Sequence, residues 1–305
     1  TKFTEVPVKV GSAPWILDGT LSVPNGPGPF PAVVLVHGSG GHDRDETIDA
    51  LKPFRDLAWG LSSNGIAVLR YEKRTLEYAK QMLPIIKQIT VKEETIDDAA
   101  AAVKLLTNQP KIDAKHIYVL GHSLGGTLMP RIARQSPDAA GFIVLAGCTR
   151  PMEDLMLEQL KYAISLKSVH TADDAKEIAA LTALIANVKD PNLTAEVPLS
   201  KLPGGMPGAY WLSLRGYNPA IVAKDIHKPF LILQGESDFQ VSMKDFKGWK
   251  DALSSRGDVT FKSYPGLSHC FANAGTPPSP ADYQTARNVS PQVITDITNW
   301  IKAQK

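Results

Sequence analysis

The residues around Ser123 have the composition expected of a serine nucleophile on a tight turn. The segment GHSLGG at positions 121–126 follows an apolar run at 117–120 and precedes a segment with helical character. A strand that turns sharply into a helix can hold one serine at the tip, and flanking glycines remove side chains that would clash in the bend. Because ordinary turns are also rich in glycine and serine, the pattern counts only in this strand and helix context.

A serine hydroxyl needs a base within hydrogen-bond reach, and the base needs an acceptor that fixes its tautomer. His269 and Asp238 each follow a late apolar run, and the chain order Ser, Asp, His is the one used with a nucleophile elbow. Glu236 shares the loop of Asp238 and is the alternative acid, but we favour Asp238. We predict that His269 is the base, because no other histidine follows a late strand.

The charge that develops on a substrate carbonyl oxygen requires hydrogen-bond donors that are already in place. Leu124 follows the candidate nucleophile and offers one backbone N–H. The second donor is predicted in the glycine-rich turn HGSGG at 37–41, with Ser39 as the first choice and Gly40 as the second. A phosphate cradle is a poorer interpretation of this turn, since the lysine of a P-loop is missing. Gly40 and His122 are also predicted to contact substrate.

Two charged clusters follow neighbouring strands, DRDE at 43–46 and RYEKR at 70–74. Clusters of mixed charge are more often structural than catalytic. We therefore expect the two clusters to form ion pairs with each other and to support the turn at 37–41.

These candidate residues require a sheet whose strand ends meet at one edge. Apolar runs without alternation are typical of strands that are covered on both faces, whereas residues 3–10 and 15–23 alternate, which predicts an antiparallel pair at the sheet edge. Strands that alternate with amphipathic helices predict a doubly wound, mostly parallel α/β sheet. The pattern at 76–92 favours neither helix nor strand. The further predicted strands are 32–36, 66–69, 117–120, 141–146, 229–233 and 259–264, and the predicted helices are 53–61, 95–106, 242–254 and 289–303.

Residues 151–224 contain no comparable strand signal, so we predict a helical insertion there, with residues 1–150 and 225–305 forming the α/β core. Helices are expected at 152–166 and 172–188, followed by a loop rich in proline and glycine. As a cap the insertion would set substrate size. Its candidate apolar substrate contacts are Met152, Met156, Tyr210 and Trp211, although a stripe of such residues is more often plain core.

The composition excludes several classes of protein. Hydrophobic residues make up 43% and charged residues 21% of the 305 residues, as in folded globular chains, and 33 basic against 31 acidic residues provide no electrostatic footprint for nucleic acid. We expect a small-molecule partner, no membrane span, no cofactor and no metal, and the sequence does not predict an oligomeric state. Cys148 and Cys270 are expected to be buried thiols rather than a disulfide. The chain begins at Thr1, so we expect a processed or cut N-terminus, and both cytoplasmic and secreted locations stay open.

The motifs resemble those of the α/β-hydrolase superfamily, more narrowly bacterial esterases of the dienelactone hydrolase and acyl-esterase branch. The opening HGSGGHDRD at 37–45 is similar to their HGSGxxDRD segment, residues 121–125 to their elbow, 235–241 to their acid turn and His269 to their base. The resemblance covers nearly the whole chain. It implies a serine hydrolase that forms an acyl-enzyme beneath a helical cap. One departure is RYEKRT at 70–75, where many relatives have RxDxRG.

The sequence therefore predicts a cofactor-independent carboxylic-ester hydrolase that uses Ser123, His269 and Asp238, with the Ser39 and Leu124 amides holding the oxyanion. The same triad could instead cleave amides or peptides, or transfer an acyl group to an alcohol. A further alternative is a binding protein that keeps the fold without catalysis.

Overall fold

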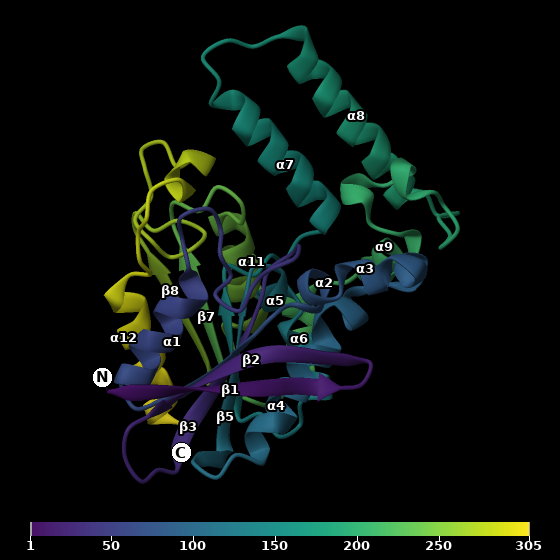
Figure 1. The fold of residues 1–305 in the computed structure, drawn as a ribbon. Coiled ribbons are helices and arrows are strands. Elements are labelled where there is room, and N and C mark those ends of the chain that lie inside the picture. Colours follow the sequence, from purple (N-terminus) through teal and green to yellow (C-terminus); the bar gives the residue numbers. More distant parts are fainter. Residues whose placement is uncertain (1, 305) are drawn as a thin grey trace.

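The computed structural model describes residues 2–304 and contains one eight-stranded sheet, in the order β1-β2-β4-β3-β5-β6-β7-β8 (Figure 1). The strands β3 to β8 run parallel to one another. At one edge, β1 and β2 form an antiparallel pair, and β2 is also antiparallel to its other neighbour, β4, so the predicted mostly parallel, doubly wound sheet with an antiparallel edge is confirmed. The strands are β1 (Phe3–Ser12), β2 (Trp15–Pro24), β3 (Phe30–Val36), β4 (Ala67–Tyr71), β5 (Ile112–His122), β6 (Gly141–Leu145), β7 (Phe230–Gly235) and β8 (Val259–Tyr264).

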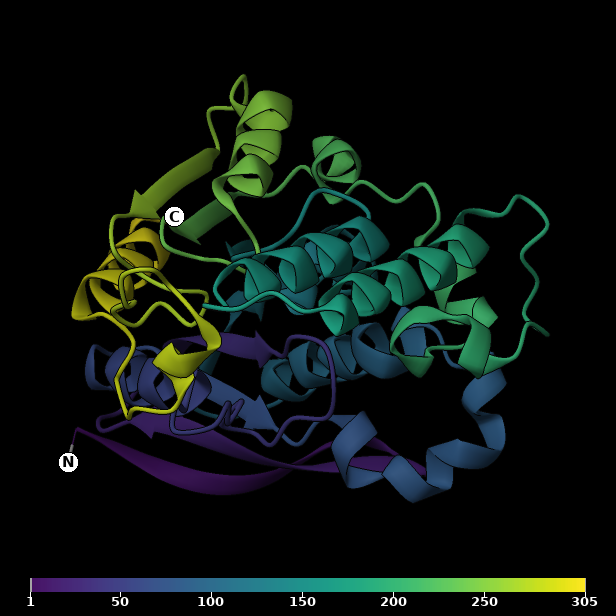
Figure 2. The ribbon, with the colours of Figure 1, turned by 90° about the horizontal axis from the view of Figure 1, so that it is seen from above.

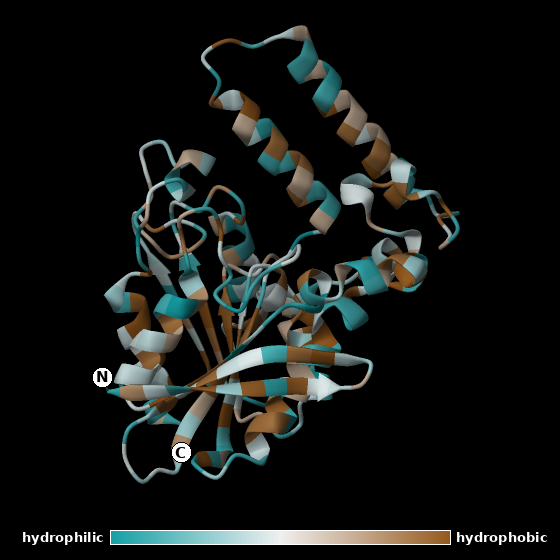
Figure 3. Cartoon of the chain, viewed as in Figure 1, coloured by the Kyte–Doolittle hydropathy of each residue, from teal (hydrophilic) through white to brown (hydrophobic). Residues whose placement is uncertain are grey.

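Helices cover both faces of the sheet, which explains the uninterrupted apolar runs of its central strands (Figures 1 and 3). The helices α1 (Pro53–Ser63) and α12 (Pro291–Ala303) pack on one face through a single apolar cluster. On the other face lie α4 (Asp97–Thr107), α6 (Met129–Gln135) and α11 (Met243–Leu253). The edge strand β1 is largely exposed, in agreement with its alternating sequence.

The register of the parallel strands aligns the segments predicted to do chemistry. Val36 at the end of β3 pairs with Gly121, and Leu145 at the end of β6 pairs with His122. The turns after β3 and β5 therefore emerge side by side at the carboxyl edge of the sheet, where open α/β sheets bind their ligands.

Between β6 and β7, residues 151–224 form helices and turns and contribute no strand to the described structure. The helices α7 (Met152–Ser165) and α8 (Ala172–Lys189) lie side by side and project beyond the carboxyl edge of the sheet (Figures 1 and 2). Shorter helices, α9 (Gly208–Leu214), α10 (Pro219–Val222) and the 3-10 turns η3 (Leu199–Lys201), η4 (Pro203–Gly205) and η5 (Ala223–Asp225), lead back to the core. Within residues 2–304, every helix is too short or too polar to span a lipid bilayer.

The ambiguous segment after β4 is a chain of short helical turns rather than one regular element. It comprises α2 (Arg74–Glu77), α3 (Ala79–Met82), the 3-10 turn η1 (Leu83–Gln88) and the π-helical turn η2 (Lys92–Ile96), which runs into α4. The α-helix predicted at 95–106 starts at Asp97, because the residues before it form the wider π turn. Within that turn the buried side chain of Glu94 accepts a hydrogen bond from Lys73. The remaining short elements are α5 (Leu124–Thr127) and η6 (Pro280–Tyr283).

Candidate active site

Ser123 occupies a strained turn between β5 and α5. Its backbone has φ 52° and ψ −115°, a conformation that costs a non-glycine residue on the order of 1–3 kcal/mol and is held by the surrounding structure. The flanking glycines are needed for close packing: a Cβ on Gly121 would lie 2.3 Å from the Gly125 oxygen, and one on Gly125 would lie 2.4 Å from the Val36 oxygen. The turn predicted from the sequence is thus a nucleophile elbow in geometry.

The structure brings Asp238 and His269 together behind this elbow. His269 Nδ1 lies 2.7 Å from Asp238 Oδ2, and both side chains are buried. Asp238 also accepts hydrogen bonds from the backbone of Gln240 and Val241 through Oδ1, at 2.8 and 2.9 Å, and from the Gln234 amide at 3.0 Å through Oδ2. Hydrogen bonds therefore hold both carboxylate oxygens of Asp238, as is required of an acid that orients a histidine.

The alternative acid Glu236 takes no part in this arrangement. Its carboxylate is exposed and accepts a 2.7 Å hydrogen bond from Ser263 Oγ. Of the two carboxylates, Asp238 is the one in contact with His269.

Hydrogen bonds to both backbone groups of Gly38 hold the glycine-rich turn after β3 in place. Gly38 donates its N–H to Glu46 Oε1 at 2.7 Å, and its carbonyl accepts a 2.6 Å hydrogen bond from Lys73 Nζ. Thr75 Oγ1 donates to the Gly40 carbonyl at 3.1 Å. Ser39 and Gly40, which follow Gly38 in this turn, line the cavity described below.

The two charged clusters form only part of the expected ion pairing. Arg44 pairs with Glu72 at 2.6 Å, and Arg70 pairs with Asp45, as predicted. Three other charged residues of the two clusters, Glu46, Lys73 and Arg74, have partners outside the clusters, because a buried charge needs a partner of opposite charge that is buried with it. These pairs are Glu46 with His122, Lys73 with Glu94 and Arg74 with Asp98.

A cavity of about 520 Å³ opens at the elbow between the sheet and residues 151–224. Most of the residues predicted to contact substrate line it. They are Ser39, Gly40, Ser123, Leu124, Met152, Met156, Tyr210 and Trp211.

The predicted pair Asp238 and His269 is buried and is not among the residues that line the cavity. His122 does not line it either, and its prediction as a substrate contact is corrected by the structure. Its ring is buried and turned away from the cavity, because both ring nitrogens are engaged in the core. They lie 2.9 Å from Glu46 Oε2 and 2.9 Å from the His269 carbonyl oxygen.

The sequence analysis missed the part of the cavity wall that follows β4, which includes Met82, Ile86, Ile89 and Glu94. Glu94 Oε1 accepts a 2.6 Å hydrogen bond from Lys73 Nζ, and Glu94 Oε2 accepts a 2.7 Å hydrogen bond from the Tyr210 hydroxyl. Burial and the neighbouring Glu94 raise the pKa of Tyr210 well above its usual value. The apolar residues at 82, 86 and 89 were a visible signal, but without a regular period they could not be assigned to a face.

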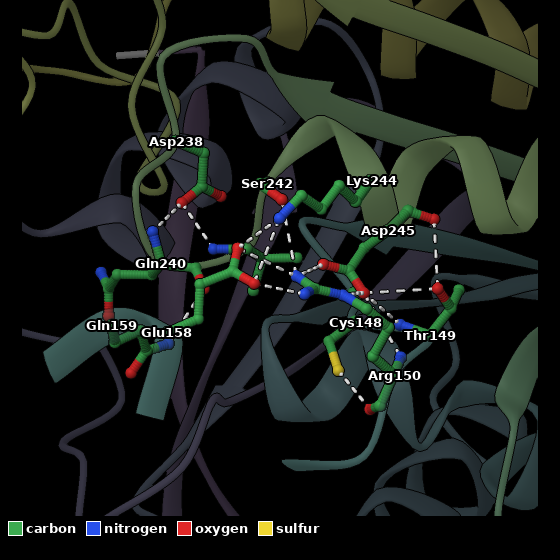
Figure 4. Close-up of polar contacts among 12 residues, drawn as sticks. Cys148, Thr149, Arg150, Glu158, Gln159, Asp238, Gln240, Ser242, Lys244 and Asp245 are labelled. Atoms are coloured by element: carbon green, nitrogen blue, oxygen red, sulfur yellow. Dashed lines mark hydrogen bonds and ion pairs between the residues drawn. The ribbon is translucent and has the colours of Figure 1, made fainter. Parts of the chain in front are cut away.

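Arg150 anchors the start of α7 to the core (Figure 4). Its guanidinium lies between Asp245 of α11, with Nη2 2.7 Å from Oδ2, and Glu158 of α7, with Nη1 2.6 Å from Oε2. The hydrogen bond with Asp245 raises the pKa of Arg150. A second link runs from Gln159 Nε2 to the Gln240 carbonyl at 3.0 Å, next to the loop that holds Asp238.

Both cysteines are free and buried, as predicted. Cys148 lines the cavity, and burial raises the pKa of its thiol to about 12. Within residues 2–304, no group of three or more His, Cys, Asp or Glu side chains is arranged to hold a metal ion.

The order of the strands, the turn at Ser123 and the cavity above it are those of the α/β-hydrolase fold. Comparison with solved structures gives the same fold. An esterase of Pyrococcus furiosus superimposes with a TM-score of 0.61 at 16% identity, over 99% of this chain and 91% of that one. Est1E of Butyrivibrio proteoclasticus gives 0.58 at 17% identity, over 97% and 96%. Acylaminoacyl peptidase of Pyrococcus horikoshii gives 0.58 at 13% identity, over 100% of this chain and 42% of that one. At these identities the likeness concerns the fold alone.

Sequence comparison narrows the class to a family. Residues 28–274 match the model described as serine aminopeptidase, S33, so the chain belongs to that family of serine hydrolases. It is also 40% identical over 285 residues to Esterase EstD of Thermotoga maritima. The match covers 93% of this chain and 65% of EstD, so the chain spans somewhat less than two thirds of the length of that relative.

Proposed function

We propose that this protein hydrolyses carboxylic esters through an acyl-enzyme. Ser123 Oγ attacks the ester carbonyl while His269 takes its proton, and His269 then returns the proton to the departing alcohol. Water attacks the acyl-enzyme with His269 again as the base, which releases the acid and restores Ser123. The N–H groups of Ser39 and Leu124 hold the oxyanion in both steps.

The observation that carries this proposal is the 2.7 Å contact between Asp238 and His269 beside the elbow of Ser123. His122 connects the two parts, since it precedes Ser123 in the chain and its Nε2 lies 2.9 Å from the His269 carbonyl oxygen. Leu124 is the first residue of α5, where a backbone N–H has no acceptor within the helix. The 40% identity to an esterase supports ester hydrolysis as the reaction.

Residues 151–224 are proposed to act as a cap that selects the substrate. They supply one wall of the 520 Å³ cavity, and four methionines, Met82, Met152, Met156 and Met206, line it. Methionine side chains adapt to apolar groups of different shape. The favoured substrates are therefore esters with a flexible apolar acyl chain or an aromatic group, rather than acetylated sugars.

The family description raises aminopeptidase activity as a second candidate. An aminopeptidase must bind the ammonium group of its substrate, which calls for a free carboxylate or other acceptors in the cavity. Among the described residues that line the cavity, Glu94 is the acidic one, and both of its oxygens are already bound, to Lys73 and Tyr210. This arrangement favours esters over free amino termini.

The test is Ser123→Ala assayed with p-nitrophenyl esters from acetate to decanoate and with amino-acid p-nitroanilides. We expect kcat/KM for the esters to fall by about 10³-fold or more, and labelling by a fluorophosphonate to disappear. Ser255→Ala, at an exposed turn far along the chain, is the control and should behave as the unaltered protein. Ester turnover that survives in Ser123→Ala would refute the proposal, and p-nitroanilide cleavage that exceeds ester cleavage would favour the peptidase.

A further inference from the structure

The buried ring of His122 has hydrogen-bond partners that accept on both sides. Nδ1 lies 2.9 Å from the Glu46 carboxylate, and Nε2 lies 2.9 Å from the backbone carbonyl of His269. A carbonyl oxygen and an ionised carboxylate can only accept, so the ring must donate from both nitrogens, which only an imidazolium can do. The alternative places the shared proton on Glu46 and leaves His122 neutral.

The surroundings favour the ionised pair. Glu46 is fully buried, yet its other oxygen accepts the N–H of Gly38 at 2.7 Å, a hydrogen bond that stabilises the carboxylate. Burial by itself would raise the pKa of Glu46, but attraction to His122 and the hydrogen bond between them lower it to about 2. Burial likewise opposes the charge on His122, and Glu46 together with the His269 carbonyl outweighs it and raises the pKa of His122.

Other titratable groups also face this pair. His37, which follows β3, and His42 lie near Glu46, and burial lowers the pKa of His37 to about 3, so it is neutral at physiological pH. On the other side, Asp238 is near His122, and the Cys270 thiol is near Glu46 with its pKa raised by burial. None of these groups replaces Glu46 as the hydrogen-bond partner of Nδ1.

We propose that His122 is a permanent imidazolium and that the buried pair of His122 and Glu46 positions the catalytic apparatus and tunes His269. The pair joins three segments through hydrogen bonds: the turn at Gly38, the elbow at His122 and the backbone of His269. The rings of His122 and His269 are 4.6 Å apart between centroids. The positive charge of His122 therefore lies directly beside the ring of the proposed base. This catalytic part rests on the proposed ester hydrolysis.

The protonation state can be measured without an activity assay. Protein labelled with ¹⁵N in its histidine rings would be examined by NMR at pH 7.5, with His122→Gln identifying the signal of His122. An ordinary histidine is mostly neutral at this pH, because its pKa is about 6.5. We expect His122 to show two protonated ring nitrogens, and a neutral ring would overturn the proposal.

The catalytic part is tested by Glu46→Gln, which keeps an oxygen for the N–H of Gly38 and lets His122 become neutral. We expect the acidic limb of the kcat/KM profile for p-nitrophenyl acetate to move to higher pH by at least about 0.5 unit, since the opposing charge is gone. Glu236→Gln, an exposed carboxylate in the loop of Asp238, is the matched control and should leave the profile unchanged.

Folding of Glu46→Gln is checked by thermal unfolding, and His122→Gln, whose amide can still donate to the His269 carbonyl, provides a second variant with the same expected shift. An unchanged acidic limb in a folded variant would overturn the tuning of His269. If the unaltered protein has an imidazolium at His122 but no esterase activity, the function proposed above fails while the ion pair stands.

Discussion

The α/β core and the helical insertion contribute to the same cavity, but they are built very differently. In the core, Glu46, Asp238 and His269 are buried, and each of their side chains has hydrogen bonds that fix its orientation. In the insertion, α8 buries only Asp174, Ile185 and Val188 of its 18 residues. The contrast fits the proposal made above, in which the buried core residues carry out the chemistry and the less buried insertion selects the substrate.

The insertion still has two kinds of support. A small apolar cluster that includes Val188, Leu202 and Trp211 gives it a core of its own, and Trp211 lines the cavity at the same time. Polar contacts then tie it to the α/β core, through Arg150 on one side and through the Tyr210 hydroxyl and Glu94 on the other. The residues offered as substrate contacts are thus both core residues and cavity wall.

The largest effect is expected in the core, from Asp238→Asn. An asparagine can no longer hold His269 in the tautomer that accepts the serine proton, so kcat should fall by about 10³ to 10⁴-fold. The loss should be the same for acetate and octanoate esters, because the defect is in the chemistry. A loss that depends on acyl length would contradict the division of labour between core and insertion.

Asp245→Ala comes next, because it removes a fully buried carboxylate that binds Arg150 and the backbone of Thr149. Leaving those donors without a partner should lower the free energy of unfolding by about 3 kcal/mol. The measurement is urea unfolding followed by circular dichroism. A change below about 1 kcal/mol would mean that the anchor on the core side is dispensable.

Acid should destabilise the core through Glu46. Its pKa is lowered from 4.5 to about 2 in the folded protein, so its contribution is present above pH 4.5 and is lost as the pH falls toward 2. The loss amounts to about 3 kcal/mol. The free energy of unfolding, measured with urea between pH 5 and pH 2.5, should therefore fall more steeply with pH in the unaltered protein than in the double variant Glu46→Gln/His122→Gln, which lacks both charges. Parallel curves would show that Glu46 is not the source.

In the insertion, Met156→Ala should act on selectivity rather than on chemistry. Removal of an apolar cavity contact should lower kcat/KM for p-nitrophenyl octanoate by about 10-fold and leave the acetate ester within about twofold. Ile221→Ala, an exposed position on α10 outside the cavity, is the matched control. Equal losses for both esters would place Met156 in structural support alone.

The smallest effect is expected at Glu158, the partner of Arg150 on the insertion side. Its side chain is 37% exposed, and exposed ion pairs contribute little, so Glu158→Ala should lower the free energy of unfolding by less than about 1 kcal/mol. Urea unfolding in parallel with Asp245→Ala compares the two ends of one arginine. A loss as large as that of Asp245→Ala would mean that the insertion is fastened as firmly as the core.

Much of the sheet could be predicted because its signals are local. The uninterrupted apolar runs identified the central strands, and the alternation at 3–10 and 15–23 identified the antiparallel edge. By contrast, the turns after β4 have no regular period, so neither their conformation nor their place in the cavity wall could be predicted. The substrate role predicted for His122 was wrong because a position next to Ser123 does not reveal on which side of the strand a ring points.

The sequence by itself determined the order of the elements, the strand-to-turn-to-helix context of Ser123 and the placement of Asp238 and His269 after late strands, since each depends on residue type and spacing within a short window. Only the tertiary structure decided the partners of Glu46, Lys73 and Arg74. The pairs of Glu46 with His122 and of Lys73 with Glu94 join segments 76 and 21 residues apart. Such pairs are selected by burial, because a charge that is removed from water must find its partner wherever the fold brings one within reach.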